Sequence, residues 1–123
     1  MENLLKDIVE QAKQNPNFRK VLLTGPKTQV VIMSLMPGEE IGEEVHPNID
    51  QVLYFVEGSG EAIIEGERAF MEQGDLILVP AGTKHNFVNS GDKDLKILTF
   101  YSPPEHPAGT IHKTKQEAED SHH

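Results

Sequence analysis

The chain has 123 residues, 37% of them hydrophobic and 25% charged, which is enough for one domain with its own core. Its formal net charge is −9, so it lacks the positive field that nucleic-acid binding requires, and we expect no nucleic-acid partner. There is no cysteine, which excludes disulfides and thiolate metal sites. No apolar run approaches the ~20 residues that cross a bilayer, and no signal-peptide pattern is evident, so we expect a cytoplasmic protein without membrane contact.

Residues 1–18 are expected to form an N-terminal helical segment. Apolar side chains recur there at helical spacing, and Asn15-Pro16 ends the pattern. The apolar positions are Leu4, Leu5, Ile8, Val9 and Ala12. We expect this short helix to pack its apolar stripe on the rest of the domain or on a partner subunit.

Residues 19–101 consist of short β-rich runs separated by glycine and proline, and no second helix interrupts the series. The candidate strands are Arg19–Leu23, Gln29–Met36, Glu43–Pro47, Asp50–Val56, Glu61–Glu65, Arg68–Met71, Asp75–Val79, Asn86–Asn89 and Leu95–Tyr101. Strands at such close, even spacing predict an all-β fold, either an antiparallel sandwich or a barrel.

Two of these strands, Asp50–Val56 and Asp75–Val79, are apolar on both faces. Such a strand needs cover outside the sheet as well as inside it. A second copy of the chain is the simplest outer cover, so we expect a homodimer.

Residues 102–123 form a Pro-rich arm followed by a polar tail, expected to be extended and then frayed or weakly helical. We expect His106 and His112 in this segment to be exposed to solvent. The alternative is that the arm closes one end of the barrel. The terminal Ser121-His122-His123 is either native or the remnant of a tag, and it is excluded from the fold prediction.

Two histidines and two oxygen donors are placed where a barrel would bring them together. Residues two apart on a strand share a face, so Glu44 and His46 point the same way. Gln51 begins the next strand, and His85 opens a later strand. If all four face inward, they suit one divalent transition metal, namely Zn, Ni, Fe, Mn or Co. Taken singly, each has a plainer interpretation, such as a surface histidine, a solvated Glu44 or a Gln51 that bonds a turn.

The spacing of two segments resembles the cupin family. The second segment has Gly74, five residues, Pro80, one, Gly82, two, His85, three and Asn89, which matches the second cupin motif at every defined position. The first has Gly38, five residues, Glu44, one, His46, four, Gln51, six and Gly58, which follows the spacing of the first motif. The resemblance, closest to small single-domain cupins of the mannose-6-phosphate isomerase-like kind, implies a double-stranded β-helix (jelly-roll barrel). It also implies a dimer and a metal inside one end of the barrel.

The departures from the family pattern concern the candidate ligands. Glu44 stands where the family has His, and Gln51 where it has Glu, so only His46 and His85 match the family's metal ligands in identity. We take Glu44, His46, Gln51 and His85 as the candidate metal site. Whether Glu44 is a ligand, a general base or a bystander stays open, as does a metal-free cupin.

The turn residues of both motifs have a structural interpretation. Gly38, Gly58, Gly74 and Gly82 are expected to adopt a positive φ, which glycine tolerates without steric cost. Asn89 is expected to bond the neighbouring backbone.

These features favour a small metal-dependent enzyme that acts on a sugar-like or hydroxy-carbonyl compound by isomerase- or lyase-type proton transfer. Alternatives are an Fe(II)-type dioxygenase and a non-catalytic cupin that binds or senses a small ligand. A phosphosugar site would need clustered cations, and the sequence offers only scattered candidates, Arg19, Arg68 and Lys84.

Overall fold

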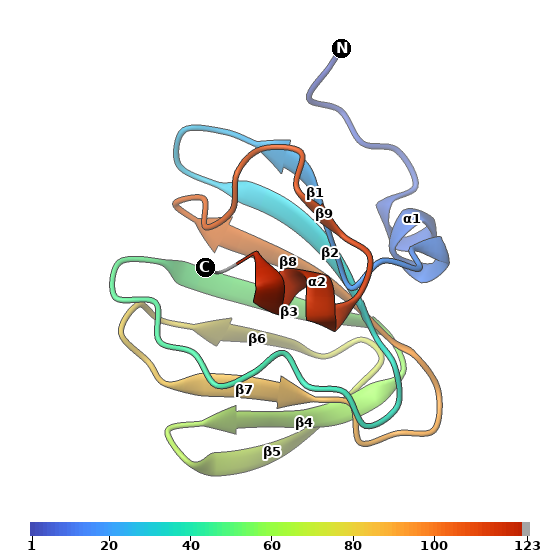
Figure 1. Cartoon of the computed structure of the whole chain (residues 1–123), viewed down its shortest axis with the longest axis vertical. Coiled ribbons are helices and arrows are strands. Elements are labelled where there is room, and N and C mark those ends of the chain that lie inside the picture. The colour runs from blue at the N-terminus through green and yellow to red at the C-terminus, as the bar shows by residue number, and fades with distance from the viewer. Residues whose placement is uncertain (122–123) are drawn as a thin grey trace.

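The computed structural model describes residues 1–121, and its chain folds into two antiparallel β-sheets that face each other (Figure 1). The larger sheet has six strands in the order β6-β3-β8-β2-β1-β9, and the smaller has three in the order β5-β4-β7. The strands are β1 (Arg19–Thr24), β2 (Gln29–Leu35), β3 (Asp50–Glu57), β4 (Ser59–Ile64), β5 (Glu67–Glu72), β6 (Leu76–Val79), β7 (His85–Val88), β8 (Leu95–Ser102) and β9 (Ile111–His112). The expected all-β fold with a short N-terminal helix is confirmed.

The predicted strand Glu43–Pro47 is wrong as a strand. Only Glu44 of this segment pairs, in an isolated antiparallel bridge to His85, and a second isolated bridge joins Glu40 to Val88. Gly42 has a φ of 111°, and Pro47 has no N–H to donate, so the ladder cannot continue on either side. The segment nevertheless lies along β7 as an irregular edge of the small sheet.

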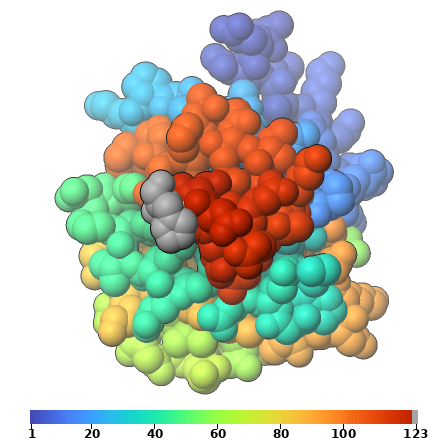
Figure 2. All heavy atoms as spheres, viewed as in Figure 1, coloured from blue at the N-terminus to red at the C-terminus, as the bar shows by residue number. Residues whose placement is uncertain are grey.

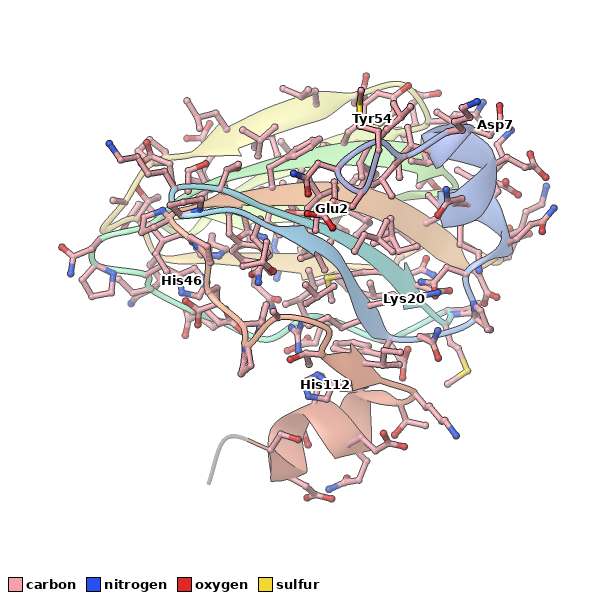
Figure 3. The ribbon with its side chains drawn as sticks, turned by 90° about the horizontal axis from the view of Figure 1, so that it is seen from above. Glu2, Asp7, Lys20, His46, Tyr54 and His112 are labelled. Carbon is pink, nitrogen blue, oxygen red and sulfur yellow. The ribbon has the colours of Figure 1, made fainter. Side chains whose placement is uncertain are left out.

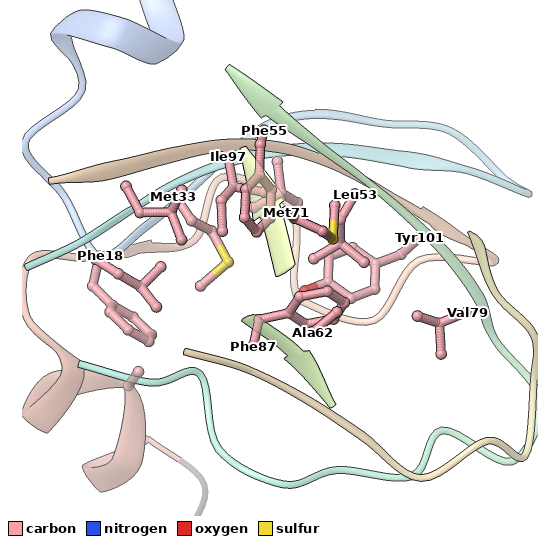
Figure 4. Packing of buried hydrophobic residues seen from close by; sticks show 14 of the residues in the cluster. Phe18, Met33, Leu53, Phe55, Ala62, Met71, Val79, Phe87, Ile97 and Tyr101 are labelled. Atoms are coloured by element: carbon pink, nitrogen blue, oxygen red, sulfur yellow. The ribbon is translucent and has the colours of Figure 1, made fainter. Parts of the chain in front are cut away.

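Apolar side chains from both sheets fill the space between them (Figure 4). Phe55 of β3 and Phe87 of β7 are both fully buried, and their rings meet edge to face with centroids 6.4 Å apart. This aromatic contact joins the two sheets at the centre of the core.

Helix α1 (Ile8–Gln14) packs on the outer face of the large sheet, where Ala12 contacts Ile32, Val56 and Leu98. The helix is shorter than its apolar pattern because Asp7 has a left-handed conformation with a φ of 52°. Neither α1 nor the second described helix is long and apolar enough to cross a membrane.

The C-terminal segment does not form a free extended arm, whereas the weakly helical tail expected after it agrees with the structure. β9 pairs with β1, and α2 (Lys115–Asp120) lies against the barrel with Ala118 in the core. Figure 2 shows this segment, coloured orange to red, lying over the front face of the molecule. His106 and His112 are half-buried, so their predicted exposure is wrong, while the alternative of an arm that closes the barrel agrees with the structure. His122 and His123 lie outside the described residues.

One buried side chain holds this segment in place. Gln29 of β2 is fully buried, and its amide oxygen accepts hydrogen bonds from the backbone N–H groups of Glu105 and His106. Its amide nitrogen donates to the backbone oxygen of His106 at 2.7 Å. A buried amide satisfied in this way fixes the path of the chain, because any displacement would leave polar groups unpaired.

The expected turn conformations are confirmed. The four glycines Gly38, Gly58, Gly74 and Gly82 have φ values between 81° and 95°. Asn89 is fully buried, and its side chain donates to the backbone oxygens of Leu35 and Lys93 and accepts from the N–H of Gly91.

The outer face of the large sheet keeps an uncovered apolar area on its edge strand β6. Leu76 and Leu78 are 61% and 55% exposed, although their neighbours across the ladder, Tyr54 and Val52 of β3, are half-buried. Helix α1 covers only another part of this face. An exposed apolar sheet face of this kind favours an interaction with a partner.

We therefore predict a homodimer in which a second copy covers Leu76 and Leu78. Leu78→Glu should shift the sedimentation of micromolar protein to the 13.7 kDa monomer, because an unpaired carboxylate is costly to bury. Phe70→Glu is the matched control, since Phe70 is 65% exposed on the other sheet and should leave the dimer intact. A wild-type chain that sediments only as a monomer would contradict the prediction.

Candidate metal centre

The backbone brings the two motif segments side by side at Glu44 and His85. Each residue donates its N–H to the other's carbonyl oxygen, and both hydrogen bonds are 2.9 Å long. Directly paired residues of an antiparallel bridge project their side chains to the same face. The backbone oxygen of His46 accepts from the N–H of Gly82 at 2.8 Å, which attaches the end of the first segment to the turn that precedes His85.

Three of the four predicted ligands converge on one point. Glu44, His46 and His85 each offer a ligand atom, and these atoms all lie within 4.8 Å of one another. The Oε2 atom of Glu44 is 2.8 Å from Nε2 of His46, and the two imidazole centroids are 5.2 Å apart. In Figure 3, His46 lies on the side of the large sheet away from α1. The group is therefore inside the barrel, near the end that the C-terminal segment covers.

The hydrogen bonds of the histidines leave the Nε2 atoms facing this point. Nδ1 of His85 is 2.9 Å from the carbonyl oxygen of Thr83, and a carbonyl only accepts, so Nδ1 carries the proton and Nε2 keeps its lone pair. Nε2 of His46 is buried, and within residues 1–121 no group forms a well-aligned hydrogen bond to it, even though Glu44 is so near. The Glu44 Oε2 and His46 Nε2 atoms are close together but are not aligned for a hydrogen bond. Such a pair of atoms suits a shared third partner, so the residues fit a metal ion.

A fifth residue, Glu105 of the C-terminal segment, contacts the far side of His46. Its Oε2 atom is 3.6 Å from Nδ1 of His46. A carboxylate in this place attracts the Nδ1 proton and turns Nε2 toward the centre, as is usual behind metal-bound histidines. Sequence reasoning missed Glu105, because its position depends on the docking of the C-terminal segment.

The fourth predicted ligand, Gln51, lies on β3 with its side chain in the interior. It is 3% exposed, and it pairs across the sheet with Tyr101 and Val79, both core residues, so its side chain faces the interior. Its amide nitrogen donates to the hydroxyl of Thr99 at 3.0 Å, which leaves its amide oxygen as the possible ligand atom. The ring of Tyr101 stands edge-on to His46 with centroids 6.2 Å apart. Coordination by Gln51 stays a prediction.

The charges of the site stabilise an ionised Glu44 and a protonated His46 in the metal-free protein. Burial raises the pKa of Glu44, but His46, Arg19 and His85 together lower it further, so it lies below the usual 4.5. The contact with Glu44 raises the pKa of His46 above 6.5 against the opposing effect of burial, and Glu105 adds to the rise. A metal ion would therefore replace a proton that this pair binds firmly.

Comparisons with known proteins agree with this architecture. The family model described as "Cupin domain" matches residues 31–101. The protein YrkC of Bacillus subtilis is 42% identical over 118 residues, which cover 91% of this chain but only 63% of YrkC. The crystal structure of BH2720 from Bacillus halodurans is 39% identical, with a TM-score of 0.94 over 96% of this chain and 94% of that one. A 5-nitrosalicylic acid 1,2-dioxygenase of Bradyrhizobium is 41% identical over 66 residues, or 53% of this chain and 31% of the enzyme.

We predict that metal binding strengthens as the pH rises from 5.5 to 8. The raised pKa of His46 adds stability to the metal-free protein below about pH 6.5, and this stability is lost as the pH rises through the raised value. The lowered pKa of Glu44 adds stability above about pH 4.5, which is lost only as the pH falls through the lowered value. As the pH rises through the raised pKa of His46, the metal competes less with the His46 proton, so its affinity should increase.

Calorimetric titration with Zn²⁺ at pH 5.5, 6.5 and 8 measures this dependence. In parallel, thermal unfolding of the metal-free protein in a chelator should show that the stabilisation by the Glu44–His46 pair is lost as the pH rises above 6.5. If the Zn²⁺ affinity is the same at all three pH values, the metal does not displace a proton from His46.

Proposed function

The chain belongs to the cupin domain family, and we propose that it is a small metal-dependent enzyme that moves a proton on a hydroxy-carbonyl or sugar-like compound. The observation that carries this proposal is the convergence of Glu44, His46 and His85 around a buried His46 Nε2 atom that lacks an aligned hydrogen bond. Fold alone supports no activity, so the proposal rests on these side chains.

Glu44, His46 and His85 would hold the ion, with Gln51 as a fourth candidate. A divalent ion supplies Lewis acidity that polarises a substrate carbonyl and stabilises the negative charge that develops on its oxygen. With one carboxylate among its ligands such a centre keeps one net positive charge, which favours an electron-rich oxygen.

The remaining side chains supply orientation and proton movement. Glu105 orients His46 through Nδ1, and its side chain is 25% exposed, so it remains accessible for proton exchange. Burial raises the pKa of Tyr101 to about 12, so its hydroxyl stays protonated at neutral pH and acts as a hydrogen-bond donor. The C-terminal segment covers this end of the barrel and places Ala118 in the core.

A dioxygenase is the second candidate. The 41% identity to 5-nitrosalicylic acid 1,2-dioxygenase over 66 residues favours it, and two histidines with one carboxylate also suit Fe(II) oxygen chemistry. A panel of sugars, hydroxy-carbonyl compounds and catechols discriminates the possibilities. Turnover without oxygen uptake supports proton transfer, turnover with oxygen uptake supports the dioxygenase, and tight binding without turnover indicates a non-catalytic cupin.

We predict close to one divalent transition metal per chain in protein purified without a chelating column. The double variant His46→Ala/His85→Ala should lose it, because two of the ligands are removed. His106→Ala is the control, since it removes an imidazole outside the three-residue group. Elemental analysis by mass spectrometry provides the measurement, and a double variant that keeps its full metal content would show that the ligands are misassigned.

We further predict that Glu44 is a ligand. Glu44→Gln should weaken metal binding by about tenfold or more, whereas Glu44→His should retain the metal and raise the charge of the site by one. Glu43→Gln is a matched control, because Glu43 is the exposed neighbouring carboxylate. Metal content that is unchanged in Glu44→Gln, with turnover reduced by roughly 10²–10⁴-fold, would instead make Glu44 a general base.

A further inference from the structure

Arg19 of β1 is a buried cation beside the candidate metal centre. It is 3% exposed, and its Nη1 group donates to Nδ1 of His112 at 3.1 Å. Its Nε atom is buried and has no hydrogen-bond partner within residues 1–121. Within residues 1–121, no carboxylate oxygen lies within 4.0 Å of a guanidinium nitrogen of Arg19. The guanidinium therefore lies in the interior without a carboxylate against it.

A buried arginine without a carboxylate partner favours an anionic ligand. Arginine does not lose its proton at physiological pH, so it cannot avoid the cost of burial by becoming neutral. Glu44 is near enough for Arg19 to lower its pKa, but Glu44 is also a candidate ligand of the metal. When Glu44 holds the ion, its charge is no longer available to Arg19 alone, and an anionic ligand would supply the missing partner.

The chain leaves room for a small anion at this place. Arg19 and Glu44 line the same cavity of about 190 Å³, together with Glu43 and with Lys115, Ala118 and Glu119. This volume corresponds to about six water molecules. Of the three candidate metal ligands Glu44 lines this cavity, so a compact ligand there would meet both the guanidinium and that side chain.

We propose that Arg19 is a specificity-determining residue that binds a carboxylate of the substrate, and that the substrate is a small 2-hydroxy or 2-oxo monocarboxylic acid. This inference rests on the proposed function, because the neighbouring hydroxyl or carbonyl oxygen of such an acid would face the metal centre. The Nε edge of a guanidinium matches a carboxylate in two parallel hydrogen bonds, and His112 holds the other side of the group. The carboxylates of Glu43 and Glu119 on the same cavity disfavour a dianion such as phosphate, so a monoanion is the better match.

Calorimetric titration of Zn²⁺-loaded protein with glycolate, with its neutral analogue glycolamide and with inorganic phosphate tests the proposal. Glycolate should bind at least about tenfold more tightly than glycolamide, as expected for a charge-assisted pair. Arg19→Gln should reduce this preference by about tenfold without changing the metal content, leaving only the part that the metal ion itself contributes, and Arg19→Lys should retain more of it. Lys115→Gln removes a positive charge from the rim of the same cavity and should change glycolate affinity by less than about threefold.

Equal binding of glycolate and glycolamide, or an Arg19→Gln variant that keeps the preference, would overturn the inference. Preferential binding of phosphate would overturn the choice of a carboxylate. If Arg19→Gln does not fold, the wild-type comparison and Arg19→Lys still decide. A wild-type chain that takes up no metal refutes the proposed function together with this inference, whereas a metal-loaded chain without carboxylate preference refutes the inference alone.

Discussion

The reciprocal pair of hydrogen bonds between Glu44 and His85 is the constraint on which the site depends. It places an irregular segment against a regular strand and turns both side chains inward. The same segment is bound to the small sheet through Ile41, whose N–H donates to the carbonyl oxygen of Phe87. The strand β7 is rigidly paired, whereas the segment opposite it contains glycine and has no repetitive backbone conformation. This combination allows carboxylate and imidazole groups to approach closely without distorting the core.

The site also joins parts of the chain that have little else in common. The metal-ligand candidates belong to the two motif segments, Glu105 comes from the C-terminal segment, and Arg19 comes from the first strand. β9 lies against β1 and so places His112 directly opposite Arg19. The charges are therefore arranged by the closure of the barrel as well as by its interior. The Glu105 carboxylate and the Arg19 guanidinium, which come from separate parts of the chain, both act on the paired Glu44 and His46.

Much of the fold was predictable from the sequence, because alternating apolar residues and turn glycines are local signals. The strand pattern, the positive φ of Gly82 and the buried bonds of Asn89 all follow from such signals. The docking of residues 102–121 was not predictable. It depends on the buried amide of Gln29, which contacts backbone groups far away in the sequence, and on Ala118, a single apolar residue in a polar tail. The roles of Arg19 and Glu105 follow from this docking, so spacing alone could not reveal them.

The region that the family model covers begins at residue 31 and ends at residue 101. Glu44, His46 and His85 lie inside this region, while Arg19, Gln29 and Glu105 lie outside it. The shared region thus contains the three groups that suit an ion, and the flanks contain the other charged and polar groups to which we assign a part in the site. Under the proposed function, a similarity confined to the shared region carries information about metal binding but little about the substrate. Exchanging the flanks between two cupins would accordingly be a route to transferring substrate preference while the metal chemistry stays in place.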